Sequence, residues 1–101
     1  TGDYSKRTEK NVLDSDGTVI ISHGFLTGGS ALTREFAIQN EKPWIHLDMK
    51  ILKLDEASEM LISWLTENEI KVLNVAGPRA GKDPMIYITA SSVLKMSLTG
   101  I

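Results

Sequence analysis

The alternation of short apolar runs with amphipathic stretches is the feature that most constrains this fold. Three apolar, partly β-branched runs are each followed by a stretch with helical spacing, and no hairpin signal joins any two of them. The expected strands span 18–22, 44–49 and 71–76, and the expected helices span 30–41, 55–69 and a stretch that begins at Asp83 and Pro84. This order predicts an α/β, Rossmann-like three-layer fold, with parallel strands flanked by helices.

The second expected helix has the clearest pattern. An apolar stripe recurs at helical spacing from Ala57 to Leu65, and Asp55 stands where an N-cap residue is expected. A further helix is expected to run from the beginning of the chain to about Asp14, before the turn at Asp16-Gly17.

The chain length indicates one domain over residues 1–101. Three strands make a narrow sheet, and buried parallel strands need cover on both faces. We therefore expect further strands, supplied by an N-terminal segment or by another chain. Exposed sheet edges would also allow a homo-oligomer.

Composition excludes several classes of partner. The net charge is −2, so the chain lacks the excess of positive charge that favours binding to nucleic acid or to an anionic membrane surface. No apolar run approaches the roughly 18 residues that span a bilayer. The chain has no cysteine, which fits a cytoplasmic protein without disulfide or thiolate chemistry.

Three expected loops meet at one edge of the predicted sheet. The carboxyl ends of parallel strands point to the same edge, and ligands of such sheets bind in the crevice outside it. The loops at 23–30, 48–54 and 76–83 follow the three strands and should therefore lie together.

The first of these loops carries a candidate phosphate site. Gly28 and Gly29 allow close backbone approach, Thr27 precedes them, and Ser30 is expected to begin a helix that contains Thr33. Free N–H groups and the helix dipole favour an anion at such an end. The alternative is that the glycines only form a sharp turn and Ser30 only caps the helix.

The third loop carries two cations, Arg79 and Lys82, which could grip the same phosphate. The alternative is that both are solvated surface charges. The loop is not a P-loop, because three residues rather than four separate Gly77 from Gly81, and Asp83 stands where a Ser or Thr would bind Mg²⁺.

Several acidic and polar residues have two interpretations. Glu35 could be a general base beside a bound phosphosugar, or a solvent-facing helix residue. Asp48 could bond a ribose hydroxyl or serve a turn. Asn11 or Asp14 could reach a site from the first helix, although the residues around Asp14 fit a cap and turn better.

The chain offers no metal-ligand set. His23 and His46 have no partner at a convincing ligand spacing, and His46 alternates with apolar residues in a strand, where it is expected to be structural. Trp44 and Trp64 are expected in the core.

The strings "RTEKNVLDSDGT", "LTGGSALTREFA" and "LNVAGPR", in this order, resemble the family of "putative molybdenum cofactor carriers", a circularly permuted branch of the Rossmann-like SLOG superfamily. The resemblance implies binding of a phosphorylated pterin, the molybdenum cofactor, or of another small, nucleotide-like phosphorylated ligand. It covers nearly the whole chain. A Gly-Gly-Gln-Thr-Gly stretch typical of the family is absent, so the chain resembles the C-terminal two-thirds of the full domain. Ala80-Gly81 also departs from the acidic-polar pair expected there.

The same superfamily includes lysine-decarboxylase-like phosphoribohydrolases with a G-G-x-G-T-x-x-E motif. Gly28, Gly29 and Glu35 match its spacing, whereas Ala31 replaces its third glycine and Thr33 lies one position late. The favoured function is therefore a binding or carrier protein. The alternative is an enzyme that cleaves nucleoside 5′-monophosphates with Glu35 as its catalytic residue.

Overall fold

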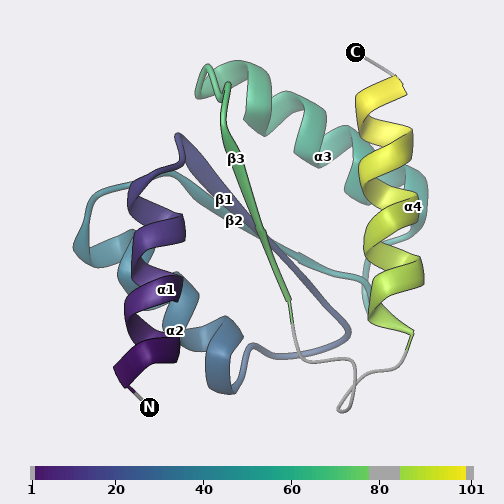
Figure 1. Cartoon of the computed structure of the whole chain (residues 1–101). Helices are drawn as coiled ribbons and strands as arrows, with labels where there is room; N and C mark the ends of the chain where they lie inside the picture. Colours follow the sequence, from purple (N-terminus) through teal and green to yellow (C-terminus); the bar gives the residue numbers. More distant parts are fainter. Residues whose placement is uncertain (1, 78–84, 100–101) are drawn as a thin grey trace.

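The computed structural model describes residues 2–77 and 85–99. Helices and strands alternate along this part of the chain (Figure 1). The elements are α1 (Gly2–Leu13), β1 (Gly17–Ser22), α2 (Gly28–Gln39), β2 (Trp44–Asp48), α3 (Leu54–Glu67), β3 (Leu73–Ala76) and α4 (Ile86–Thr99).

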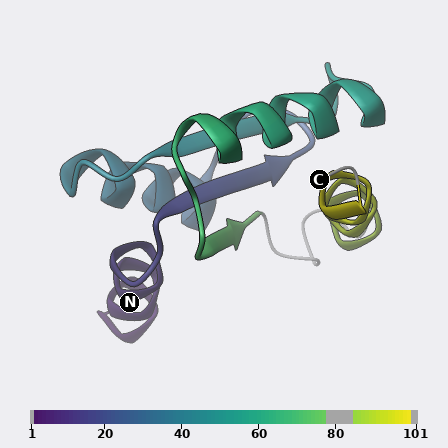
Figure 2. The ribbon, with the colours of Figure 1, turned by 90° about the horizontal axis from the view of Figure 1, so that it is seen from above.

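The strands form one parallel sheet in the order β2-β1-β3. Thr18 of β1 lies opposite Trp44 on one side and Asn74 on the other. Helix α1 packs with α2 and helix α3 packs with α4, and Figure 2 shows α1 and α3 on opposite sides of the strands. The expected α/β, Rossmann-like fold is confirmed. Among the described residues β2 and β3 are the edge strands, and self-association through an exposed edge stays a prediction.

The two faces of the sheet differ in chemistry. Val19, Ile21 and Leu47 are fully buried in an apolar core with residues of α3 and α4, among them Leu61 and Val93. Because side chains alternate along a strand, the intervening residues face α1 and α2. These intervening residues include the polar side chains of Thr18, Ser22, His46, Asp48 and Asn74. The face toward α3 and α4 is thus mainly apolar, and the face toward α1 and α2 carries polar groups beside the buried Ile20.

Two helices begin before the expected residue. Helix α2 begins at Gly28 with Thr27 as its N-cap, so the prediction that Ser30 begins it is wrong by two residues. Gly28 has a φ of 52°, a left-handed value that glycine adopts without strain. Helix α3 begins at Leu54 rather than after Asp55, because Lys53 is the N-cap and its N–H donates to the Glu56 carboxylate at 2.9 Å.

Asp16 explains why β3 begins later than expected. Its carboxylate accepts the N–H groups of Lys71 and Val72 at 2.9 and 2.8 Å, and its own N–H donates to the Val72 carbonyl. These residues therefore form a turn, and the strand begins at Leu73. The same bonds hold the pKa of Asp16 below its usual value. The turn role expected for this region is confirmed.

Three further expectations concern the last helix, the core and membrane-spanning segments. The cap at Asp83 and Pro84 lies outside the described residues, and α4 is described from Ile86. Trp64 packs against the apolar core as expected. Within residues 2–77 and 85–99, none of the helices has the length and apolar character needed to cross a bilayer.

Candidate functional site

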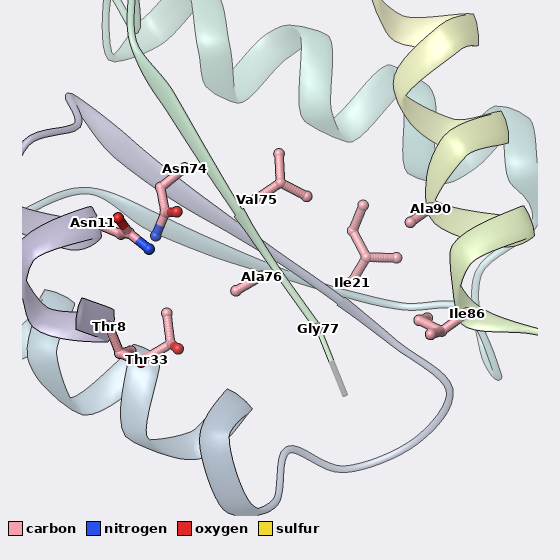
Figure 3. A pocket seen from close by; sticks show the side chains of 10 residues that line it. All are labelled: Thr8, Asn11, Ile21, Thr33, Asn74, Val75, Ala76, Gly77, Ile86 and Ala90. Carbon is pink, nitrogen blue, oxygen red and sulfur yellow. The ribbon is translucent and has the colours of Figure 1, made fainter. Parts of the chain in front are cut away.

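A cavity of about 340 Å³ lies along the outer edge of β3, between α1 and α4 (Figure 3). It is lined by Thr8, Asn11, Ile21, Thr33, Asn74, Val75, Ala76, Gly77, Ile86 and Ala90. Its volume falls within the range of small-molecule sites, about 300–1,000 Å³. The cavity includes the carboxyl end of β3, which is the edge where the sequence predicts ligand binding.

The cavity has a polar and an apolar part. Figure 3 shows the polar side chains on one side of β3, toward α1 and α2, and the larger apolar ones on the other, toward α4. The polar part consists of Thr8, Asn11, Thr33 and Asn74. No described residue that lines the cavity carries an ionisable side chain, so these residues offer hydroxyl and amide groups rather than charges.

Thr33 connects this cavity to the Gly-Gly loop. It lines the cavity, and its hydroxyl donates to the Gly29 carbonyl at 2.8 Å. The first turn of α2 therefore borders the cavity. The Ser30 N–H donates to the Thr27 carbonyl at 3.1 Å. The preceding amides, of Gly28 and Gly29, belong to the end of the helix where N–H groups lack intrahelical acceptors.

Ser30 is unusual among the buried polar residues. Its side chain is only 3% exposed, and its Oγ has no hydrogen-bond partner among the described residues. The hydroxyl does not cap the helix, because Thr27 occupies the N-cap position. A buried polar atom without a partner costs free energy, so it needs an explanation such as a ligand or an ion. Three of the predicted phosphate-site residues, Thr27, Gly28 and Gly29, directly precede Ser30 in the chain.

The loop that leads to this turn is fixed at Gly24. The Gly24 N–H donates to Asp48 Oδ1 at 2.7 Å, and the Ser22 hydroxyl donates to the Gly24 carbonyl at 2.8 Å. Gly24 has a φ of 100°, which favours glycine. Asp48 also accepts the Lys50 N–H, so the structure bears out the turn interpretation of this residue. These hydrogen bonds, led by that from Gly24, hold the pKa of Asp48 below its usual value.

His46 supports the same loop from β2. Its Nε2 lies 2.7 Å from the Ser22 hydroxyl, and because that hydroxyl donates to Gly24, the ring donates to Ser22. Burial lowers the pKa of His46, and the Arg34 charge lowers it too, against the opposing effect of Asp48. The structural role expected for His46 is therefore confirmed.

Acid is expected to destabilise the fold through His46. Its pKa is lower in the folded state than in the unfolded state, so between these values the unfolded chain binds more protons. This contribution is complete above about pH 6.5 and is lost as the pH falls toward the folded pKa. Thermal unfolding between pH 7.5 and pH 5 should show a falling melting temperature, and His46→Gln should flatten that fall. An equally steep fall in the variant would contradict the assignment to His46.

Of the other predicted site residues, those that the structure describes do not line the cavity. Glu35 is about half exposed on α2 and lies 3.6 Å from Nε of Arg34, in an ion pair on the helix surface. Asp14 pairs with Lys10 on α1. Arg79 and Lys82 lie outside the described residues. In the part of the chain that is described, no group of three or more His, Cys, Asp or Glu residues could hold a metal ion.

Sequence reasoning missed two polar residues of the cavity lining. Thr8 and Asn74 were not singled out, whereas Asn11 was named as a residue that could reach a site. The sequence does mark Asn74, because it is the one polar residue within the short apolar run "VLNVA". For Thr8 the sequence offers none beyond its place in the family-like string.

Comparisons with known proteins identify one matching family and one similar crystal structure. The family model of the "Circularly permutated YpsA SLOG family" matches residues 1–98. A crystal structure of a "Putative molybdenum carrier protein" from Syntrophus aciditrophicus SB is 57% identical and superimposes with a TM-score of 0.94. The match covers 97% of this chain and 62% of that one, so the chain spans less than two-thirds of the neighbour's length. A search of curated proteins gave no match.

Proposed function

Because the chain belongs to the circularly permutated YpsA SLOG family, we propose that it is a binding or carrier protein for a small phosphorylated ligand. The phosphate would lie at the first turn of α2, against the amides of Gly28 and Gly29 and the hydroxyl of Ser30. The rest of the ligand would occupy the cavity beside β3.

The unpartnered Ser30 hydroxyl is the observation that carries this proposal. It is a buried donor at the end of a helix where the macrodipole and free amides favour an anion. Thr33 connects the proposed phosphate site to the cavity, because its hydroxyl donates to Gly29 in this turn and its side chain lines the cavity. A phosphate oxygen at Ser30 would satisfy the hydroxyl. The cations of Arg79 and Lys82 stay a prediction as partners of that phosphate.

The name of the similar protein suggests molybdenum as the cargo. The described residues contain no cluster of three metal-ligating side chains, and the chain has no cysteine. In a phosphorylated pterin, donor atoms of the organic ligand itself would hold a molybdenum atom. The protein would bind the phosphate and the ring rather than the metal.

The described geometry does not favour the hydrolase alternative. Glu35 is paired with Arg34 on the surface of α2, and the described lining of the cavity includes no carboxylate. A general acid or base must come within hydrogen-bond reach of the atom on which it acts. We therefore propose binding without catalysis.

Ser30→Ala tests the proposal, because it should raise the stability of the free protein and lower its affinity for a phosphorylated ligand. A serine with a purely structural role would not affect the affinity. Removing an unpartnered buried hydroxyl should stabilise the free protein by about 1 kcal/mol. The same change should weaken binding of ribose 5-phosphate by about tenfold or more, because one hydrogen bond to a charged phosphate is lost. Urea unfolding gives the first quantity and calorimetric titration the second.

Ser92→Ala is the matched control. Ser92 lies on α4, and its hydroxyl already donates to the Ile88 carbonyl at 2.9 Å. This variant should leave the affinity unchanged. If the unaltered chain binds neither ribose 5-phosphate nor a nucleoside monophosphate, or if Ser30→Ala leaves the affinity unchanged, the proposed phosphate site is wrong.

A further inference from the structure

We propose that Asn11 and Asn74 recognise the edge of a neutral nitrogen heterocycle, which is the ring part of the ligand. This inference rests on the proposed function, because it concerns the other end of the same ligand. It assigns a role to two residues that lie in separate family-like strings, "RTEKNV" and "LNVAGPR".

The fold brings these two carboxamides to one cavity. Asn11 belongs to α1 and Asn74 to β3, and both line the polar part of the cavity, on the same side of β3 (Figure 3). Asn74 donates one N–H to the Thr18 hydroxyl at 3.3 Å, which orients its side chain on the sheet. In the described part of the chain, no further hydrogen bond engages either carboxamide. Asn74 thus keeps its Oδ1 and one N–H for a ligand, and Asn11 keeps its whole carboxamide.

The chemistry of the pair defines the ring. A carboxamide presents a donor and an acceptor side by side, and asparagine uses both on a purine edge that offers a neighbouring acceptor and donor. The described lining of the cavity carries no ionisable group, so it offers no countercharge to a charged ring. Purines and pterins are neutral rings with such edges.

The size of the cavity and a small side chain beside Asn74 suit a flat ring. Ala76 follows Asn74 on the same face of β3 and presents only a methyl group, so this neighbour adds no bulky side chain beside the carboxamide. The volume of about 340 Å³ admits a bicyclic heterocycle with its sugar or side chain. Thr33 lies on the same side of β3 and leads back to the first turn of α2, where the phosphate is proposed.

Two ligands that differ in the ring test the assignment. Guanosine 5′-monophosphate carries both phosphate and ring, and ribose 5-phosphate lacks the ring. In titrations of the full chain, Asn74→Leu and Asn11→Leu should each weaken the nucleotide about 5- to 30-fold and leave ribose 5-phosphate unchanged. Asn68→Leu, an exposed asparagine at the end of α3, is the matched control and should change neither affinity.

Each outcome decides a separate point. Selective loss of the nucleotide supports the assignment. Equal loss of both ligands, or no loss, overturns it while the phosphate site stands. If the unaltered chain binds neither ligand, the proposed function and this inference both fail.

If the asparagine variants instead change the oligomeric state in size-exclusion chromatography without changing nucleotide affinity, another polypeptide occupies the cavity and the inference is overturned. Asn11 is exposed, so its variant remains informative should Asn74→Leu unfold.

Discussion

Replacing Gly77 by valine is expected to destabilise the protein by about 1–3 kcal/mol and to distort the cavity. A Cβ at this position would lie 2.7 Å from the Ile21 carbonyl oxygen and 3.7 Å from Cγ1 of Ile86. The first contact involves backbone, which cannot rotate away, so the end of β3 must move from β1. Urea unfolding would report the loss in stability, and titration with ribose 5-phosphate would report the distortion.

Val75→Thr is the control for that experiment. Val75 lies on β3, two residues before Gly77, is 43% exposed, and keeps its β-branched shape in the variant. Its effect should stay within about 0.5 kcal/mol, the usual range for surface substitutions. If Gly77→Val were no more destabilising than Val75→Thr, the close approach of β3 to β1 would not constrain this residue.

The fold could be predicted because its signals are local. Each strand is a short apolar run, and the periodicity of the stretch from Ala57 to Leu65 identifies α3 directly. The parallel arrangement follows from the absence of hairpin turns. Strand order could not be predicted, because it depends on which strand pairs with β1 on each side, and the residues 18–22 carry no mark of that choice.

Helix beginnings were less predictable because the cap can be supplied in several ways. Ser30 was the better cap by residue type, yet Thr27 holds that position because Gly28 accepts a left-handed φ and begins the helix earlier. In α3 the cap residue is Lys53, whose N–H is satisfied by the Glu56 side chain three residues later. The carboxylate of Asp55 instead accepts the adjacent Glu56 N–H.

The candidate site could be predicted only in part, because some of its residues are identified locally and others meet only in the folded structure. The Gly-Gly turn and Thr33 could be named from composition and position in the chain. Asn74 and Thr8 could not be paired from sequence, because their meeting requires α1 to lie over one face of β3 at the sheet edge. Spacing suggested Glu35, but spacing alone does not show that its carboxylate pairs with Arg34 at the surface.

The division of the sheet into an apolar and a polar face predicts a second large effect, at Leu61. This side chain is fully buried in the core that α3 and α4 form with Val19, Ile21 and Leu47. Leu61→Ala removes buried methyl groups and leaves a cavity, so it should cost about 2–5 kcal/mol. A domain of this size has about 5–15 kcal/mol of stability in all, so the midpoint of urea unfolding should fall sharply.

Ile51→Ala separates this effect from a general loss of apolar surface. Ile51 is 78% exposed after β2, and its truncation should change stability by less than about 0.5 kcal/mol. Leu61 contacts the face of the sheet opposite Asn74, so the folded fraction of Leu61→Ala should bind ribose 5-phosphate with nearly unchanged affinity. A loss of affinity as large as that of Ser30→Ala would show that the two faces are coupled, because the apolar face would then determine the shape of the polar one.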